Sequence, residues 1–199
     1  MKIVLATGNQ GKVRELNEIL SDLGVEVLSL KEYPDIGEIV EDGNSFEENA
    51  IIKAKAVCDA TKLISLADDS GIEVDYLDGA PGIYSARFAG EGRNDDDNNM
   101  KLLSLLSEVP FEKRTTRYRC VIAVCTPEGE VFTADGTCEG IIGFELKGEK
   151  GFGYDPLFYL PEYGKTFAEI DPDVKNKISH RGRAVAKAKN VLAGIIKKA

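Results

Sequence analysis

Two adjacent carboxylates, Asp68 and Asp69, are the first residues in this sequence whose type and position suggest chemistry. They follow an apolar run over residues 64–67 that predicts a short buried strand, and the polar run 68–71 indicates that the strand ends there. Both acids would then lie at the carboxyl-terminal edge of a strand, where open α/β sheets bind their ligands. Because neighbouring strand residues face opposite ways, we expect only Asp69 to enter the site.

An acidic loop through Glu41 could complete a metal site with Asp69. Carboxylate oxygens suit magnesium, which keeps several waters and takes its other ligands from substrate phosphates. The sequence therefore predicts magnesium as the cofactor, held by Asp69 and Glu41. A solvated acidic turn is the alternative, and it competes strongly for Glu41 because the chain is rich in acids.

A polar turn near the amino terminus is a candidate phosphate site. It follows the apolar run 3–6, where a strand should lead into a helix whose first N–H groups can bind a phosphate. It is not a Walker A loop, because Ala6 and Val13 stand where that pattern needs glycine and a hydroxyl residue. A plain turn is the alternative. A cation at a helix start opposes the helix dipole and adds no stability by itself, so Lys12 at this position favours the interpretation as a phosphate site. The candidate phosphate contacts are Thr7, Gly8, Asn9, Gln10, Gly11 and Lys12.

A second lysine is placed by helical spacing. Lys53 lies one turn after Asn49 in a segment with helical apolar periodicity, so both project from the same side of that helix. Such a lysine can reach a phosphate oxygen as a point charge. The alternative is a surface lysine, which is how we interpret Lys55.

A glycine-rich aromatic segment could hold a flat base. In residues 151–156, GFGYDP, the glycines would let a base approach the backbone and Phe152 could stack on it. The alternative is a tight turn with Phe152 in the core. Residues 179–181, SHR, then offer several hydrogen-bond donors in a row, suited to a base that bears carbonyl oxygens.

The charge of the chain is unevenly distributed. The net charge is −9, yet from Val174 onward the sequence holds eight lysines and arginines and no acid. An anion-binding face is therefore compatible with the acidic whole. Lys197 and Lys198 are expected to complement the carboxyl end of a last helix. Three of the other cations and the histidine are expected to precede that helix and so need another explanation: Lys175, Lys177, Arg181 and His180.

Length and composition indicate an ordinary globular protein. The chain has 199 residues, 43% hydrophobic and 30% charged, so we expect one domain over residues 1–199 with two lobes. Four cysteines without a CxxC pair and a single histidine argue against a zinc site and favour a reduced, cytoplasmic setting. The first residues turn polar too soon for a signal peptide, and no run approaches the roughly 20 apolar residues of a membrane span.

The pattern of elements predicts a mixed α/β sheet flanked by helices. Helical spacing after residue 13 should end at Gly24, and Ser45 with Glu48 forms a possible capping box for the helix that carries Lys53. The expected strands cover residues 3–6, 25–30, 64–67, 117–126 and 131–140, and later helices cover 100–106 and 185–195. Residues 77–94 and 148–156 are expected to be ordered loops.

These segments together resemble the inosine triphosphate pyrophosphatase family. The matching segments are LATGN at residues 5–9, FEENA at 46–50, ADDSG at 67–71, GAPGIYSAR at 79–87, FGYDP at 152–156 and SHR at 179–181. Each is modest alone, but their common order along nearly the whole chain makes chance an unsatisfactory explanation.

The resemblance implies an activity and a role for each candidate. The family hydrolyses ITP, dITP and XTP to the monophosphate and pyrophosphate, on an elongated mixed sheet with the active-site cleft between two lobes, and is typically dimeric. By resemblance Asp69 would be the catalytic and metal-binding carboxylate, and Lys53 would act with residues 7–12 on the phosphates. The substrate contacts would further include Ser70, Phe152, Gly153, Tyr154, Asp155, Lys175, His180 and Arg181.

Three other interpretations compete with this one. A Maf-like nucleotide pyrophosphatase would open with a serine- and arginine-rich turn, which residues 7–9 do not match. A nucleic-acid contact through the basic carboxyl-terminal segment is disfavoured because the rest of the chain is acidic and its aromatics are not interleaved with the cations. A nucleotide sensor without turnover is disfavoured by the residues around Asp69. We therefore expect no nucleic-acid or membrane partner.

Overall fold

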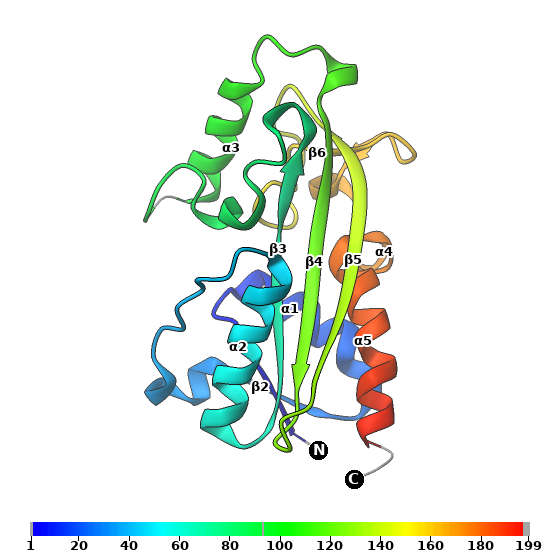
Figure 1. Ribbon diagram of the computed structural model, residues 1–199. Helices are drawn as coiled ribbons and strands as arrows, with labels where there is room; N and C mark the ends of the chain where they lie inside the picture. The colour runs from blue at the N-terminus through cyan, green and yellow to red at the C-terminus, as the bar shows by residue number, and fades with distance from the viewer. Residues whose placement is uncertain (1, 93, 197–199) are drawn as a thin grey trace. The chain divides into compact units, whose positions relative to one another are not determined.

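The computed structural model describes residues 2–92 and 94–196, so Lys197 and Lys198 lie outside the described residues (Figure 1). The chain divides into two compact units. Unit 1 comprises Met1–Asp69, Cys120–Gly136 and Arg181–Ala199, and unit 2 comprises Ser70–Arg119 and Thr137–His180. Each unit has a hydrophobic cluster of its own. No helix within the described ranges is long and apolar enough to cross a membrane.

Unit 1 opens as expected, with a strand, a turn and a helix. Strand β1 (Lys2–Leu5) leads into α1 (Gln10–Leu20), and Asn9 caps the helix by accepting from the backbone of Gly11 and Lys12. A short 3-10 turn extends α1 to Leu23, and Gly24 ends it in the left-handed region at φ +63°. Strand β2 (Glu26–Ser29) then pairs in parallel with β1, which also pairs in parallel with β3 (Ile64–Val74).

Helix α2 (Phe46–Thr61) forms where the capping signal predicted it. Ser45 Oγ accepts from the backbone N–H of Glu48 at 3.1 Å. The carboxylate of Glu48 reaches one residue further back than a capping box requires, and accepts from the backbone of Asn44 at 2.7 Å. Both contacts satisfy N–H groups at the start of the helix, which fixes the direction in which α2 leaves the acidic loop.

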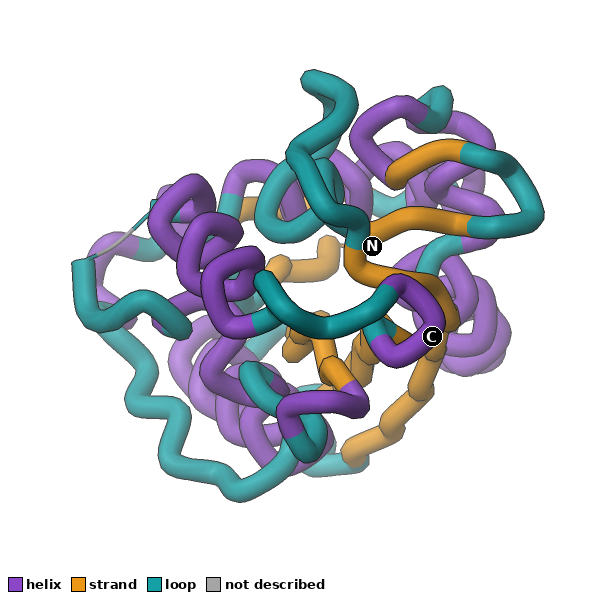
Figure 2. The backbone as a smooth tube through the Cα atoms, turned by 90° about the horizontal axis from the view of Figure 1, so that it is seen from above, coloured by secondary structure: helices purple, strands orange, loops and turns teal. Residues whose placement is uncertain are grey.

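Helices lie on both faces of the strands in unit 1 (Figures 1 and 2). Ile64 and Leu66 of β3 pack in one cluster with residues of α1 and α5 (His180–Ile196). The intervening Ser65 instead donates to the carbonyl of Ala54 in α2 at 2.5 Å. Alternate residues of β3 therefore face different helices, and this alternation continues into the two acids that follow.

The predicted end of the third strand is wrong. Strand β3 continues from Ile64 through Asp68 and Asp69 to Val74, so the two acids lie inside a strand of 11 residues and not at its edge. A strand can carry charged residues at buried positions when each charge meets a partner, and both acids do so here. Periodicity in the sequence could not show those partners, because they come from distant segments.

Unit 2 contains the carboxyl-terminal part of β3, from Ser70 to Val74, and the helix α3 (Asp95–Leu105). Helix α3 begins earlier than predicted because Asn94 caps it. The predicted hairpin is confirmed as β4 (Thr115–Cys125) and β5 (Val131–Ile142), whose residues are divided between the units. Short strands β6 (Phe158–Leu160) and β7 (Lys165–Thr166) complete one sheet of order β2-β1-β3-β4-β5-β6-β7. The expected mixed α/β sheet is thus confirmed.

The sequence predicted that Lys175, Lys177, His180 and Arg181 all precede the last helix, but only the two lysines do so. Lys175 and Lys177 lie in a helix that was not predicted, α4 (Pro172–Ile178), which begins with Asp171 as its cap. His180 and Arg181 occupy the first turn of α5. Helix α4 has only 7 residues, too few for a clear apolar periodicity.

Replacing Gly148 by alanine should destabilise the fold more than replacing Gly129. Both glycines have positive φ, at +85° and +91°, so both substitutions carry the strain of the left-handed region, about 1 kcal/mol. A Cβ on Gly148 would also lie 2.4 Å from the carbonyl of Ala168, whereas one on Gly129 would meet nothing within 4 Å. We expect Gly148→Ala to cost about 1–3 kcal/mol more in the free energy of unfolding, measured in urea. Equal losses of stability in the two variants would show that a Cβ at position 148 does not clash with Ala168.

Candidate active site

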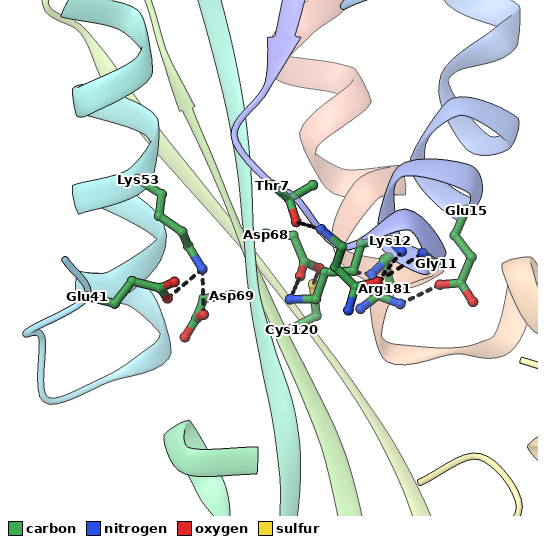
Figure 3. Close-up of polar contacts among 11 residues, drawn as sticks. Thr7, Gly11, Lys12, Glu15, Glu41, Lys53, Asp68, Asp69, Cys120 and Arg181 are labelled. Carbon is green, nitrogen blue, oxygen red and sulfur yellow. Dashed lines mark hydrogen bonds and ion pairs between the residues drawn. The ribbon is translucent and has the colours of Figure 1, made fainter. Parts of the chain in front are cut away.

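Three predicted residues come together on one side of β3. Lys53 of α2 donates from Nζ to Asp69 Oδ1 at 2.7 Å and to Glu41 Oε2 at 2.8 Å (Figure 3). Lys53 and Asp69 are buried, while the side chain of Glu41 is 36% exposed. Ser45 and Glu48 start α2 beside the acidic loop, and the helix then carries Lys53 back to β3. One ammonium is therefore shared by two carboxylates at a partly open position.

The charges of this group are tuned by burial and by each other. Burial and the neighbouring Glu41 raise the pKa of Asp69 to about 6, although Lys53 and Lys12 act in the opposite direction. Burial works against the ammonium of Lys53, but Asp69 and Glu41 outweigh it and hold the pKa of Lys53 above its usual value. Asp69 is thus a carboxylate that can accept a proton near neutral pH, next to a lysine that keeps its own.

The same group suits a divalent cation. Among the described residues there is no cluster of three or more histidine, cysteine or acidic side chains that could enclose a metal by themselves. Magnesium does not need one, because it binds through one or two carboxylates and completes its shell with water and substrate phosphates. Asp69 and Glu41 supply two hard oxygen ligands that already converge on one positive charge, the ammonium of Lys53.

Asp68 faces the opposite side of β3, as the alternation of a strand predicts (Figure 3). Its fully buried side chain forms ion pairs with Lys12 and with Arg181, whose Nε lies 2.9 Å from Asp68 Oδ2. Cys120 donates from Sγ to the same oxygen at 3.0 Å, and Arg181 also pairs with Glu15. Burial alone would raise the pKa of Asp68, but Arg181 and Lys12 outweigh it and hold this pKa well below its usual value.

The predicted phosphate turn lies at the start of α1, next to this ion-pair network. Asn9 Oδ1 accepts from the N–H groups of Gly11 at 2.9 Å and Lys12 at 3.2 Å, and Thr7 Oγ1 accepts from Asn9 N at 3.2 Å. Gly8 faces open space, since a Cβ there would meet nothing within 4 Å. A phosphate that uses the N–H groups of Gly11 and Lys12 must therefore displace the side chain of Asn9.

Most of the residues predicted to surround a base gather in unit 2, whereas Arg181 belongs to unit 1. Lys175 Nζ lies 2.6 Å from Asp155 Oδ2, and this carboxylate also accepts from the backbone of Phe152 at 2.9 Å. The ammonium of Lys175 lies over the ring of Phe152 at 5.2 Å from its centroid. His180 stacks on Tyr118, with ring centroids 4.4 Å apart and planes 8° apart. Ser70, a further candidate, belongs to the same unit.

The two remaining candidates of the glycine-rich segment have different surroundings. Gly153 is held by α3, because its N–H donates to Asp95 Oδ2 at 2.7 Å and its carbonyl accepts from Asn99 Nδ2 at 2.9 Å. Tyr154 packs in the hydrophobic core of unit 2, and its hydroxyl donates to the carbonyl of Ser85 at 2.8 Å. Phe152 is the half-buried ring and Tyr154 is the core ring, a difference that two aromatic residues so close in the sequence do not reveal.

The structure thus sorts the predicted residues into one group per unit. Unit 1 holds residues 7–12, Glu41, Lys53, Asp69 and Arg181, while Ser70, residues 152–155, Lys175 and His180 belong to unit 2. Sequence reasoning missed several residues that hold these side chains: Glu15, Asp68, Asn99, Tyr118 and Cys120. Of these residues only Asp68 could have been suspected from the sequence, because it lies beside Asp69. Its ion-pair partners are far away in the sequence and could not be identified there.

Lys53→Met should lower stability whereas Lys55→Met should not. Methionine keeps the apolar stem but leaves the carboxylates of Glu41 and Asp69 without their shared cation, so we expect a loss of about 1–3 kcal/mol. Lys55 is exposed on the same helix, and its replacement should change stability by about 0.5 kcal/mol or less. Urea unfolding of both variants measures the difference. Equal stability of the two variants would mean that Lys53 does not bridge these acids in solution.

Comparison with known proteins places the whole chain in one family. The Ham1 family profile matches residues 3–191. A dITP/XTP pyrophosphatase of Desulforamulus reducens is 60% identical over 192 residues, 96% of each chain, and one of Geobacter sulfurreducens is 51% identical with the same coverage. A solved HAM1 protein from Coxiella burnetii superimposes with a TM-score of 0.88 at 40% identity, covering 98% of this chain and 99% of its own. The chain therefore belongs to the Ham1 family.

Proposed function

We propose that this protein hydrolyses the deaminated purine nucleotides ITP, dITP and XTP to the monophosphate and pyrophosphate, and so removes them from the nucleotide pool. The names of its relatives support this substrate class. The observation that carries the proposal is the group of Lys53, Asp69 and Glu41, in which a lysine and two acids meet at a partly open position. Cleavage of a triphosphate needs such a group, with a cation for the phosphates and a base for water.

The reaction would be a single displacement at the α-phosphorus. Residues 7–12 and Lys53 bind the phosphates, and the ammonium groups of Lys12 and Lys53 spread the negative charge that develops. Asp69 takes a proton from the attacking water while the water oxygen bonds to the α-phosphorus. The bond from that phosphorus to the bridging oxygen breaks, and pyrophosphate leaves. Magnesium, held by Asp69 and Glu41, would supply neutralisation of the phosphate oxygens when bound.

The base would be selected by hydrogen-bond donors. Hypoxanthine and xanthine carry a carbonyl at C6, which accepts from donors such as His180 and Arg181. Adenine carries an amino group there, and it would leave those donors without an acceptor. The half-buried ring of Phe152 offers a stacking face, and Lys175 and Asp155 hold it in place. Ser70, Gly153 and Tyr154 are assigned to the same substrate by the family resemblance.

The remaining parts of the proposal concern the protein as a whole. Residues 1–199 would act as a single pyrophosphatase domain, in the cytoplasm, where the nucleotide pool is found. The family resemblance implies a homodimer, which sedimentation equilibrium at micromolar protein would show as twice the mass of the chain.

A panel of triphosphates tests the proposed activity. We expect pyrophosphate release from ITP, dITP and XTP. Their kcat/KM should exceed that for ATP by a factor on the order of 10² or more, because only their bases carry a C6 carbonyl that accepts from the protein's donors. A chelator should abolish turnover and added magnesium should restore it. A protein that binds ITP in calorimetry but releases no pyrophosphate would be a sensor, and the proposed activity would then be rejected.

Asp69→Asn tests the assigned base. The amide cannot accept the proton of the attacking water, so kcat for ITP should fall by about 10²–10⁴. Asp59→Asn is the matched control, since Asp59 is exposed on α2 and takes no part in the site. Turnover of the Asp69 variant at the level of this control would remove Asp69 from the mechanism.

A further inference from the structure

The proposed reaction gives roles to Lys12 and Arg181 but none to the carboxylate that joins them. The side chain of Asp68 is 0% exposed and pairs with both cations. An isolated buried carboxylate is costly, and a buried ion pair by itself adds little stability compared with apolar packing. A buried acid that binds two assigned substrate contacts therefore calls for a functional explanation.

The two oxygens of Asp68 are used differently. Oδ1 pairs with the ammonium of Lys12, and Oδ2 accepts from Arg181 Nε at 2.9 Å and from Cys120 Sγ at 3.0 Å. Arg181 and Cys120 are buried, whereas the side chain of Lys12 is 14% exposed. The carboxylate is thus fixed through Oδ2 by buried donors and presents Oδ1 to the more accessible cation.

We propose that Asp68 is a positioning residue that anchors Lys12 for the phosphates and Arg181 for the base. This inference rests on the proposed function. Because both cations are bound to one carboxylate, Lys12 and Arg181 would keep fixed positions relative to each other. The phosphates and the base of the substrate would then be held at a fixed separation.

The donor geometry lets Lys12 serve substrate without leaving Asp68. An ammonium carries three N–H donors, so one can stay on Asp68 while others face a phosphate. Lys12 extends from the first turn of α1 and is the last residue of the turn predicted to bind phosphate. Without the carboxylate the flexible lysine stem would have many positions open to it, and ordering it on substrate would cost conformational entropy.

Arg181 is held from two sides. Asp68 binds its Nε, and Glu15 of α1 pairs with its Nη1 (Figure 3). The guanidinium is planar and rigid, so two carboxylates on different nitrogens fix its plane as well as its position. Glu15 follows Lys12 by three residues on α1, so the same helix carries the phosphate-binding lysine and the second support of Arg181.

The first experiment compares Asp68→Asn with a matched change elsewhere. We expect kcat/KM for ITP to fall by about 10–100-fold and the ratio of kcat/KM for ITP to that for ATP to fall as well, because both cations lose their anchor. Asp75→Asn is the control: Asp75 also pairs with an arginine, Arg117 at 2.8 Å, but lies outside the site. It should change neither quantity.

Two further variants separate the two arms of the anchor. Lys12→Gln should lower kcat/KM for ITP and ATP by the same factor and leave their ratio unchanged, because phosphates are common to both. Glu15→Gln should lower the ratio by loosening Arg181, while binding of inorganic pyrophosphate, measured by calorimetry, stays at the wild-type level. Asp68→Asn should weaken pyrophosphate binding and lower the ratio together.

The outcomes distinguish this inference from the proposed function. If the wild-type protein hydrolyses ITP and the folded Asp68→Asn variant keeps its ratio and its pyrophosphate affinity, the anchor is rejected and the function stands. A wild-type protein that releases no pyrophosphate from any triphosphate rejects the function instead, while weaker pyrophosphate binding by Asp68→Asn would still support the Lys12 arm. If Asp68→Asn does not fold, an unchanged ratio in Glu15→Gln overturns the Arg181 arm.

Discussion

Strand β3 places two adjacent carboxylates on opposite faces of a buried sheet, and each charge has to be balanced on its own side. This constraint organises unit 1. Asp69 meets Lys53 from α2, and Asp68 meets Lys12 from α1 and Arg181 from α5. Because a buried carboxylate without a cation is costly, the helices that cover β3 must bring lysine and arginine to these positions.

The two acids differ in pKa because their surroundings differ. Two cations and a thiol surround Asp68 and keep it ionised, which suits a permanent anchor. Asp69 shares one ammonium with Glu41, and burial raises its pKa to about 6, which suits a group that exchanges a proton. Residues of one type, next to each other in the sequence, thereby acquire opposite properties, a pattern expected where catalytic groups are tuned by their environment.

Local elements were largely readable from the sequence because their causes are local. The spacing of Leu16 and Leu20 places α1, and Gly24 ends it because the left-handed turn there favours glycine. The hairpin of β4 and β5 follows from its turn. The prediction failed at β3, where polar residues continue the strand, and at α4, which is too short for a periodic pattern. In both cases distant partners or a cap outweighed local propensity.

The sequence by itself determined the types and order of the chemical groups: the acids at 68 and 69, the lysines at 12, 53 and 175, and motifs sufficient to recognise the family. It also determined that neighbouring acids in a strand face apart, since the period of a strand is two residues. Only the tertiary structure decided which cation meets which acid, because Arg181 and Asp68 are joined by folding across more than a hundred residues. Burial and pairing are properties of the packed chain, so the pKa values and the anchoring role of Asp68 arise there.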